Sequence, residues 1–520
     1  MKTFLVHVRD DNFCRVLPET RHPSESGTGR VKVVAFPPLG IQTLAPVLRQ
    51  RGHQVRMFDT AHPQMTAAQI AQAVAHERPD VIALSFLSTT TYPTVKHLAQ
   101  RLKAEATTTP IIVGGAFATL NADRLLGDCP HIDCVGVGEG EDLLPEYLDH
   151  LGEPGVVAGL VWRRDGTIVA NAPRPLLRDL DQFPYPDRTS LPIDYVESLP
   201  LDVPAVLSLD KFCTVQTSRG CPYACSYCDI PALGAGRWRG RSPAHVLGEL
   251  QELNDRGYRS IYFTDDHFLL NRKRIDAICR GIIDRNLAFH WGCEGRADAV
   301  GIDRLGVMRQ AGCQALAFGV EAGTQKVLDR LKKRQTPAQV EHAVREAKRQ
   351  GIARVHGFFL VGAPEETEDD ILESFRFAAR LELDTFGFNR LCVYRGTPLW
   401  QEYVARGIID DERDWHKWFK CSDIDPTTVP SAVVNRLRAK GYGLLFRHRV
   451  LKRPIRTWKL LRAFSRHMRL SDLLTLLSSP FRRRTLTRKP ELPARMIEAK
   501  LEAPDRGTAA ATARPARRAG

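Results

Sequence analysis

Short apolar runs alternate with amphipathic patterns along the N-terminal part of the chain. The runs predict buried strands, and apolar positions spaced three and four residues apart predict helices between them. The expected strands are 3–8, 54–59, 81–87, 110–117 and 134–141, and the expected helices are 37–52, 66–77, 92–105 and 142–151. Strands alternating with helices in this way indicate a doubly wound, Rossmann-like α/β domain over residues 1–151.

A second series of the same kind covers residues 211–415. The expected strands are 215–218, 261–266, 289–298, 315–323, 354–364 and 385–398, and the expected helices are 242–257, 274–286, 304–312, 336–351 and 369–382. These six units predict a partial (β/α)6 barrel, whose chemistry would lie at the carboxyl ends of its strands.

The segments outside the two domains have their own patterns. Residues 152–210 form a connector, with a hairpin signal at 160–170 and a Pro-rich stretch after it. Residues 416–489 are expected to form a basic helical extension, and residues 490–520 have the composition of a disordered tail.

Charge is concentrated in the C-terminal extension. The chain carries a net charge of +14, and residues 447–489 contain 14 Lys and Arg against one acid, Asp472. Apolar positions recur there at Trp458, Leu461 and Phe464 with basic residues between them. This amphipathic pattern fits peripheral contact with a membrane surface or a helix packed on the barrel. Nucleic-acid binding is disfavoured, because few aromatic residues are interleaved with the basic ones.

Neither export nor membrane insertion is indicated by the sequence. The first residues, MKTFLVHVRD, lack a charged segment followed by an apolar core, and no apolar stretch approaches the length that spans a bilayer. We therefore expect a cytoplasmic protein with reduced thiols, either free in solution or peripheral at the inner face of the membrane.

Three cysteines cluster in the segment SRGCPYACSYCDI, at Cys221, Cys225 and Cys228. A structural zinc site would need a fourth ligand, and the other nine cysteines are scattered without a second pair. A disulfide is not expected in a reducing compartment. Three thiolates can hold three irons of a 4Fe–4S cluster and leave the fourth iron open to another ligand.

The spacing CxxxCxxC, with Tyr227 before the third cysteine, resembles the signature of the radical S-adenosylmethionine (SAM) superfamily. The resemblance implies that the open iron chelates the amino and carboxylate groups of SAM. It also implies that an electron from a flavodoxin- or ferredoxin-type reductant cleaves SAM and releases a 5′-deoxyadenosyl radical.

Polar and glycine residues lie at the predicted carboxyl ends of the barrel strands. They are Asp265, Asp266, Glu294, Arg296, Glu321, Gly362 and Pro364. Acids beside apolar strands are costly unless they meet a ligand or a partner, so helix capping and ion pairs remain alternatives. The resemblance implies that the two aspartates bind the methionine amino group. It assigns ribose and carboxylate contacts to Glu294, Arg296 and Glu321, and adenine contacts to the glycine and the proline.

One position departs from the family pattern. Arg395 stands in RGTP where proline is usual, and we expect it to contact an anionic substrate or a cofactor phosphate.

The N-terminal domain has glycine-rich strand ends of its own, at Gly114–Gly115 and at Gly138–Glu139. Glycine allows backbone to approach a ligand closely, although plain tight turns would explain it too. The stretches PPLGIQTLA, VIALSF, IIVGGAFAT and VGVGEGE resemble the cobalamin-binding domain that precedes many radical SAM enzymes. The Asp-x-His-x-x-Gly motif, whose histidine ligates cobalt, is absent. His22 could reach the cobalt, or it is a surface histidine.

This order of domains resembles that of the class B radical SAM methyltransferases and of the anaerobic magnesium-protoporphyrin ester cyclases. It implies methylation of an unactivated carbon of a hydrophobic, lipid- or tetrapyrrole-type small molecule, with cyclisation as the alternative. A methylthiotransferase would need another cysteine triad and an RNA-binding barrel, which are not visible. An electron-transfer protein would not need the acidic strand ends. No GxxxxGK[ST] motif supports ATP hydrolysis.

Overall fold

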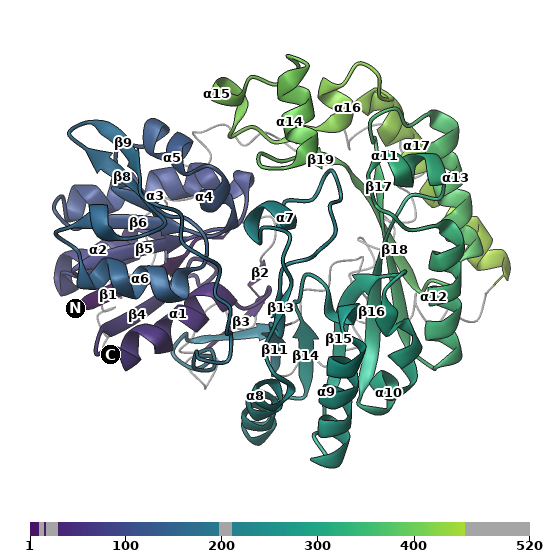
Figure 1. Ribbon diagram of the computed structural model, residues 1–520, viewed down its shortest axis with the longest axis horizontal. Coiled ribbons are helices and arrows are strands. Elements are labelled where there is room, and N and C mark those ends of the chain that lie inside the picture. Colours follow the sequence, from purple (N-terminus) through teal and green to yellow (C-terminus); the bar gives the residue numbers. More distant parts are fainter. Residues whose placement is uncertain (10–14, 17–29, 197–210, 453–520) are drawn as a thin grey trace, which may run out of the picture.

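The computed structural model describes residues 1–9, 15–16, 30–196 and 211–452. Two α/β units lie side by side, the N-terminal one at the left of Figure 1 and the barrel at the right. The expected fold class, a Rossmann-like domain followed by a partial barrel, is confirmed. His22, the tail 490–520 and most of the basic segment 447–489 lie outside the described residues.

The N-terminal sheet has the strand order β4-β1-β5-β6-β7-β8-β9. Its parallel strands are β1 (Lys2–His7), β4 (Gln54–Asp59), β5 (Val81–Ser85), β6 (Ile111–Gly114) and β7 (Cys134–Gly136). The chain reverses direction across the sheet between β1 and β5, and doubly wound folds bind their ligands beyond the strand ends at such a point.

Helices cover both faces of this sheet and bury two separate apolar cores against it. They are α1 (Leu39–Gln50), α2 (Ala67–Glu77), α3 (Tyr92–Glu105), α4 (Ala116–Leu120), α5 (Ala122–Asp128) and α6 (Gly140–Asp149). The start of α2 is fixed by a capping box, in which Thr66 and Gln69 each satisfy a backbone N–H of the other.

The connector is built into the N-terminal unit. The predicted hairpin is present as β8 (Leu160–Arg164) and β9 (Thr167–Ala170), which extend the sheet beyond β7. A small sheet not expected from the sequence joins β10 (Ile193–Val196) to β3 (Val31–Val34) and β2 (Arg15–Val16). Its strands are short and pair over a long sequence distance, so no local pattern reveals them.

The barrel sheet follows chain order, β11-β14-β15-β16-β17-β18, with parallel neighbours throughout. Its strands are β11 (Phe212–Val215), β14 (Ser260–Phe263), β15 (His290–Arg296), β16 (Cys313–Glu321), β17 (Arg354–Val361) and β18 (Thr385–Arg390). The helices are α8 (Pro243–Asp255), α9 (Arg272–Asp284), α10 (Leu305–Gln310), α11 (Gln325–Arg330), α12 (Pro337–Arg349) and α13 (Glu368–Arg380). One large apolar core lies between sheet and helices.

The chain after the barrel folds back onto both units. Its elements are β19 (Cys392–Val393), α14 (Pro398–Ala405), α15 (Asp411–Asp414), β20 (Phe419–Lys420), α16 (Cys421–Ile424) and α17 (Ser431–Lys452). Val434, Leu437 and Leu445 of α17 enter the barrel core, whereas Trp415 enters a core of the N-terminal unit. Within the described ranges no helix has both the length and the apolar character needed to cross a membrane.

Candidate active site

The three clustered cysteines lie in a loop that two short strands close. β12 (Ser218–Arg219) pairs antiparallel with β13 (Arg239–Gly240), and the loop between them also holds α7 (Ile230–Leu233). Gly220 has a φ of 84°, and a Cβ there would lie 2.0 Å from the carbonyl oxygen of Arg237. The loop therefore requires glycine at its entrance.

All three thiols of the loop are free, and Cys225 is buried. Burial raises the pKa of Cys221, and it raises the pKa of Cys228 to about 12; the neighbouring thiols raise both further. In the described part of the chain no three Cys, His, Asp or Glu side chains converge on one metal ion.

Two of the predicted site residues support this loop from the barrel side. The guanidinium of Arg296 lies 3.8 Å from the ring centroid of Tyr223, donates to Cys225 Sγ at 3.6 Å, and pairs with Asp298 at 2.8 Å. Glu321 accepts from Lys333 Nζ at 2.7 Å. Burial, and then the charge of Glu321, raise the pKa of Tyr227.

The two adjacent aspartates after β14 have different surroundings. Asp265 is buried, and its carboxylate accepts from the backbone of Thr217 at 2.5 Å, from the hydroxyl of Thr217, and from the backbone of Ser218 at 2.9 Å. Asp266 is exposed and accepts from Gly220 N at 2.7 Å. Asp265 therefore fixes the chain that enters the cysteine loop, whereas Asp266 keeps an oxygen available.

Glu294 resembles Asp266 in being exposed, and the charges of the two carboxylates interact. It is exposed, and its carboxylate accepts from the hydroxyl of Tyr262 at 2.8 Å. Desolvation by the surrounding protein raises the pKa of Glu294, and the charge of Asp266 raises it further. Neither carboxylate forms an ion pair with any described cation. Two repelling carboxylates without a cation are suited to a positively charged ligand such as the ammonium group of SAM.

The predicted adenine segment ends β17. Gly362 N and Ala363 N donate to the Glu366 carboxylate at 2.6 and 2.9 Å, so both N–H groups already have a partner within the turn. Burial raises the pKa of Glu366 to about 8. Pro364 is buried in the same turn. A ligand at this segment would therefore contact its surface by packing and would not accept hydrogen bonds from these two N–H groups.

Open backbone occurs at the strand ends of the N-terminal sheet. A Cβ on Gly114 would meet nothing closer than 4.0 Å, and one on Gly138 nothing within 4 Å. Gly115 is required by the fold itself, because its Cβ would lie 2.3 Å from the Phe86 carbonyl oxygen. Leu87, two residues beyond the end of β5, is 66% exposed. The backbone at Gly114 and Gly138 is therefore unobstructed at these strand ends.

Glu139, predicted as a cofactor residue, faces the barrel unit. It accepts from Arg219 at 2.9 Å and from Arg239 at 2.6 Å, and Glu141 forms a second ion pair with Arg219. Burial would raise the pKa of Glu139, but its hydrogen bonds with Arg239 and the charge of Arg219 hold it below the ordinary value. The end of β7 is thus tied to the two strands that close the cysteine loop.

A cavity of about 240 Å³ joins the strand ends of the N-terminal sheet to the cysteine loop. It is lined by Leu87, Ser88, Thr89, Phe117, Leu120, Asn121, Asp229, Val393, Tyr394, Arg395, Trp400, Trp415 and Lys417. Asp229 directly follows Cys228, and α7 contacts α4 across the boundary between the units. The geometry therefore brings the strand ends of the N-terminal sheet beside the cysteine loop.

Arg395 borders this cavity but is held in ion pairs. It donates to Asp411 at 3.0 Å, and across the boundary to Asp123 at 3.1 Å and to the Leu120 carbonyl at 2.8 Å. Its charge is satisfied by protein carboxylates, so its expected contact with an anionic ligand is not needed to explain its position.

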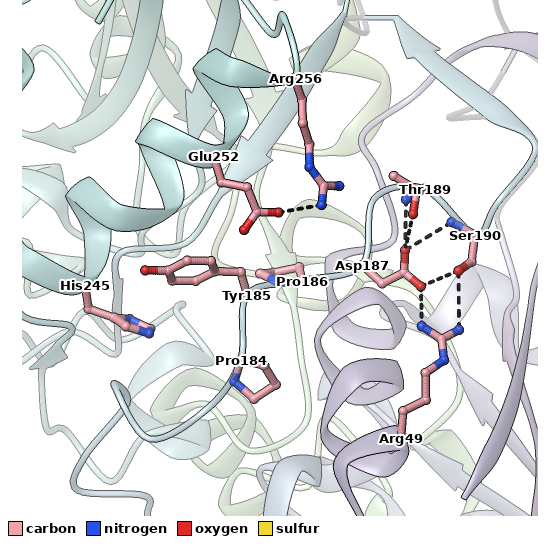
Figure 2. A pocket seen from close by; sticks show the side chains of 10 residues that line it. All are labelled: Arg49, Pro184, Tyr185, Pro186, Asp187, Thr189, Ser190, His245, Glu252 and Arg256. Atoms are coloured by element: carbon pink, nitrogen blue, oxygen red, sulfur yellow. Dashed lines mark hydrogen bonds and ion pairs between the residues drawn. The ribbon is translucent and has the colours of Figure 1, made fainter. Parts of the chain in front are cut away.

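A second pocket, of about 520 Å³, lies on the connector between α1 and α8 (Figure 2). Its two arginines are paired, Arg49 with Asp187 at 2.5 Å and Arg256 with Glu252 at 2.8 Å. None of the predicted site residues lines it.

Several residues at this site were not predicted from the sequence. Arg219 and Arg239 flank the cysteine loop, and they could have been flagged only by their positions before and after it. Leu87 and Tyr394 are large apolar side chains left 66% and 40% exposed, which becomes visible only in the folded chain.

Comparison with known proteins agrees with this arrangement. Residues 31–148 match the B12 binding domain, and residues 215–378 match the radical SAM superfamily. An uncharacterized methyltransferase of Pyrococcus horikoshii is 30% identical over 446 residues, which cover 83% of this chain and 93% of the relative. The anaerobic magnesium-protoporphyrin IX monomethyl ester cyclase of Cereibacter sphaeroides is 25% identical, with 84% and 70% covered.

Two solved structures share the fold. The cobalamin-dependent radical enzyme OxsB, with aqua-cobalamin and SAM bound, superposes with a TM-score of 0.66 at 17% identity, over 92% of this chain and 75% of that one. TsrM of Kitasatospora setae, with cobalamin and a [4Fe-4S] cluster bound, gives 0.62 at 18% identity, over 78% and 75%. The chain belongs to the cobalamin-dependent radical SAM methyltransferase family, an enzyme family whose cofactors are cobalamin, a 4Fe–4S cluster and SAM.

Proposed function

We propose that this enzyme methylates an unactivated carbon of a hydrophobic small molecule of the lipid or tetrapyrrole type. The observation that carries the proposal is the cavity shared by the end of β5 and Asp229, beside the third cysteine of the loop. Methyl transfer to carbon needs a methyl carrier and a radical source on opposite sides of one substrate, and this cavity adjoins both candidate cofactor surfaces.

The chain has residues suited to each cofactor. Cys221, Cys225 and Cys228 would hold the cluster, and the surface at Gly114, Gly138 and Leu87 would hold cobalamin. When bound, the cluster supplies the electron that cleaves SAM, and cobalamin carries the methyl group. The protein's own part is to orient both groups and to keep water away from them.

Asp266 and Glu294 would bind the SAM ammonium group, because they are exposed carboxylates with no cationic partner among the described residues. Asp265 would position the entry to the loop through Thr217 and Ser218. Arg296 and Glu321 would support the loop from behind, through Cys225 and Tyr227. The turn at Gly362 and Pro364 would pack against the adenine.

The apolar part of the cavity wall, which lies among polar lining residues, favours an apolar substrate. Leu87 and Tyr394 expose large apolar surfaces, and Phe117, Trp400 and Trp415 contribute aromatic rings. Similar relatives include a hopanoid C-3 methylase of Methylococcus capsulatus and a bacteriochlorophyllide d C-8(2)-methyltransferase of Chlorobaculum tepidum, at 27% and 23% identity. A flavodoxin- or ferredoxin-type protein would supply the electron. Oxidative cyclisation is the second candidate, favoured by the similarity to the cyclases.

The test is anaerobic turnover with the reconstituted cluster, hydroxocobalamin, dithionite and SAM. We expect 5′-deoxyadenosine and S-adenosylhomocysteine together. The Cys225→Ala variant should yield neither product, whereas Cys213→Ala, which removes a buried thiol from the barrel core, should yield both. 5′-Deoxyadenosine alone would favour cyclisation. Neither product from the intact protein in the presence of a lipid or tetrapyrrole extract would refute the proposed chemistry.

The proposed SAM contacts have a binding test. Asp266→Asn and Glu294→Gln should each weaken equilibrium SAM binding about tenfold, which corresponds to the loss of one charge-assisted hydrogen bond. The iron content of both variants should stay unchanged, because neither side chain is among the three cysteines that would hold the cluster. Unchanged affinity in both variants would remove these carboxylates from the SAM site.

A further inference from the structure

Two strands close the cysteine loop, and they place like charges opposite each other. Arg219 of β12 is the direct cross-strand partner of Arg239 of β13. Like charges in directly opposed positions destabilise a strand pair. The closure of the loop therefore depends on something that separates or neutralises these two guanidinium groups.

The neutralising group comes from the N-terminal domain. Glu139 lies between the arginines, with Oε1 2.9 Å from Arg219 and Oε2 2.6 Å from Arg239. Glu141 adds a second carboxylate to Arg219. The connector completes the arrangement, because Leu177 N donates to Glu139 at 2.9 Å and the Leu177 carbonyl accepts from Arg239 at 2.7 Å.

Both ends of this contact lead directly to proposed cofactor surfaces. Glu139 follows Gly138, whose backbone faces open space at the end of β7. Arg219 precedes Gly220 and Cys221, and Gly220 N donates to Asp266 at 2.7 Å. All four side chains are mostly buried, so solvent and salt screen the contact only weakly.

We propose that Arg219 and Glu139 are positioning residues that couple the cobalamin surface to the SAM site. A shift of the β7 turn when cobalamin binds moves Glu139, and Glu139 sets the separation of the strands that carry the cysteine loop. Because binding free energies are reciprocal, cobalamin then changes the affinity for SAM, and SAM changes the affinity for cobalamin by the same factor. The inference rests on the proposed function, in that both ligands must bind.

The experiment measures SAM affinity of the cluster-reconstituted protein, anaerobically, with and without bound hydroxocobalamin. For the unaltered enzyme we expect the two affinities to differ by about fivefold or more. In Glu139→Gln the ratio should fall to about one, since a neutral amide cannot neutralise both guanidinium groups. Arg219→Lys should do the same, because an ammonium group lacks the fork that contacts two carboxylates at once.

The matched control is Asp123→Asn, which removes an ion pair across the same domain boundary without touching the cysteine loop. It should keep the ratio of the unaltered enzyme. The proposal would be overturned if Glu139→Gln and Arg219→Lys both kept the coupling, or if the control lost it equally. It would also be overturned if cobalamin and SAM bound the unaltered enzyme independently. Failure of the proposed function is distinguishable, because it would appear as missing methyl transfer in the turnover assay, whereas failure of this proposal appears in the ratio of the two SAM affinities. If either Glu139→Gln or Arg219→Lys does not fold, the affinity ratio of the other variant tests the proposal.

Discussion

Two of the contacts between the domains have opposite character. Beside the cysteine loop the contact is ionic, with Glu139 and Glu141 facing Arg219 and Arg239. On the other side of the cavity it is mainly aromatic, with Trp415 lying 5.2 Å from Tyr92 and 6.1 Å from Phe117, measured between ring centroids. Burial of a large aromatic ring gives non-directional stability, whereas ion pairs fix an orientation. We therefore expect the aromatic contact to contribute more to the association of the domains, and the ionic contact to set how the cysteine loop faces its neighbour.

The largest expected effect comes from the aromatic contact. Trp415→Ala should lower the free energy of unfolding by about 3–5 kcal/mol, because it empties a buried site between the domains. Denaturant unfolding followed by circular dichroism measures this. Trp418→Ala is the control: Trp418 is 48% exposed and lies outside both large cores, so its loss should cost under about 1 kcal/mol. Equal costs for the two variants would contradict the assigned role of Trp415.

The ionic contact should contribute less to stability. Arg219→Ala removes one ion pair from each of two carboxylates, of which Glu139 keeps its pair with Arg239, and should cost about 1.5–3 kcal/mol. Arg345→Ala, which breaks an exposed pair within one helix, should cost almost nothing by the same unfolding measurement. A cost for Arg219→Ala as large as that for Trp415→Ala would reverse the comparison.

Lowering the pH should weaken the stability contributed by the ionic contact but not that contributed by the aromatic contact. The pKa of Glu139 is lowered in the folded protein below its ordinary value of 4.5. Its contribution to stability is therefore fully present above that value and is lost as the pH falls through the folded pKa. The stability difference between the unaltered enzyme and Glu139→Gln, measured from pH 6 to pH 3 (about the range of carboxylate titration), should shrink toward zero. The cost of Trp415→Ala should stay nearly constant, and a parallel decline of both would argue against an ionic role.

The smallest effect is expected where an ion pair crosses the boundary at the surface. The side chain of Asp123 is 53% exposed where it meets Arg395, and Arg395 keeps its pair with Asp411. Asp123→Asn should change the unfolding free energy by less than about 1 kcal/mol. A larger loss would show that this pair contributes to domain association as the aromatic contact does.

The local pattern of apolar and polar positions was enough to predict most of the helices and strands. The helix predicted at 92–105 is α3, Tyr92–Glu105, and the strand predicted at 54–59 is β4, Gln54–Asp59. Both are long enough for the period of their apolar positions to distinguish helix from strand. The pairing of β3 with β10 was missed because it joins short segments about 160 residues apart.

The sequence by itself determined the fold class and the cysteine loop, because these are encoded in periodicity and in the spacing of three cysteines, and its resemblance to a known family indicated the cofactors. It could not separate Asp265 from Asp266. These neighbours have the same chemistry, and only the folded chain gives the first to the backbone of Thr217 and Ser218 and leaves the second exposed. Nor could it show that Glu139 binds two arginines of the other domain. Contacts between distant segments depend on how the domains pack, and no local pattern records that.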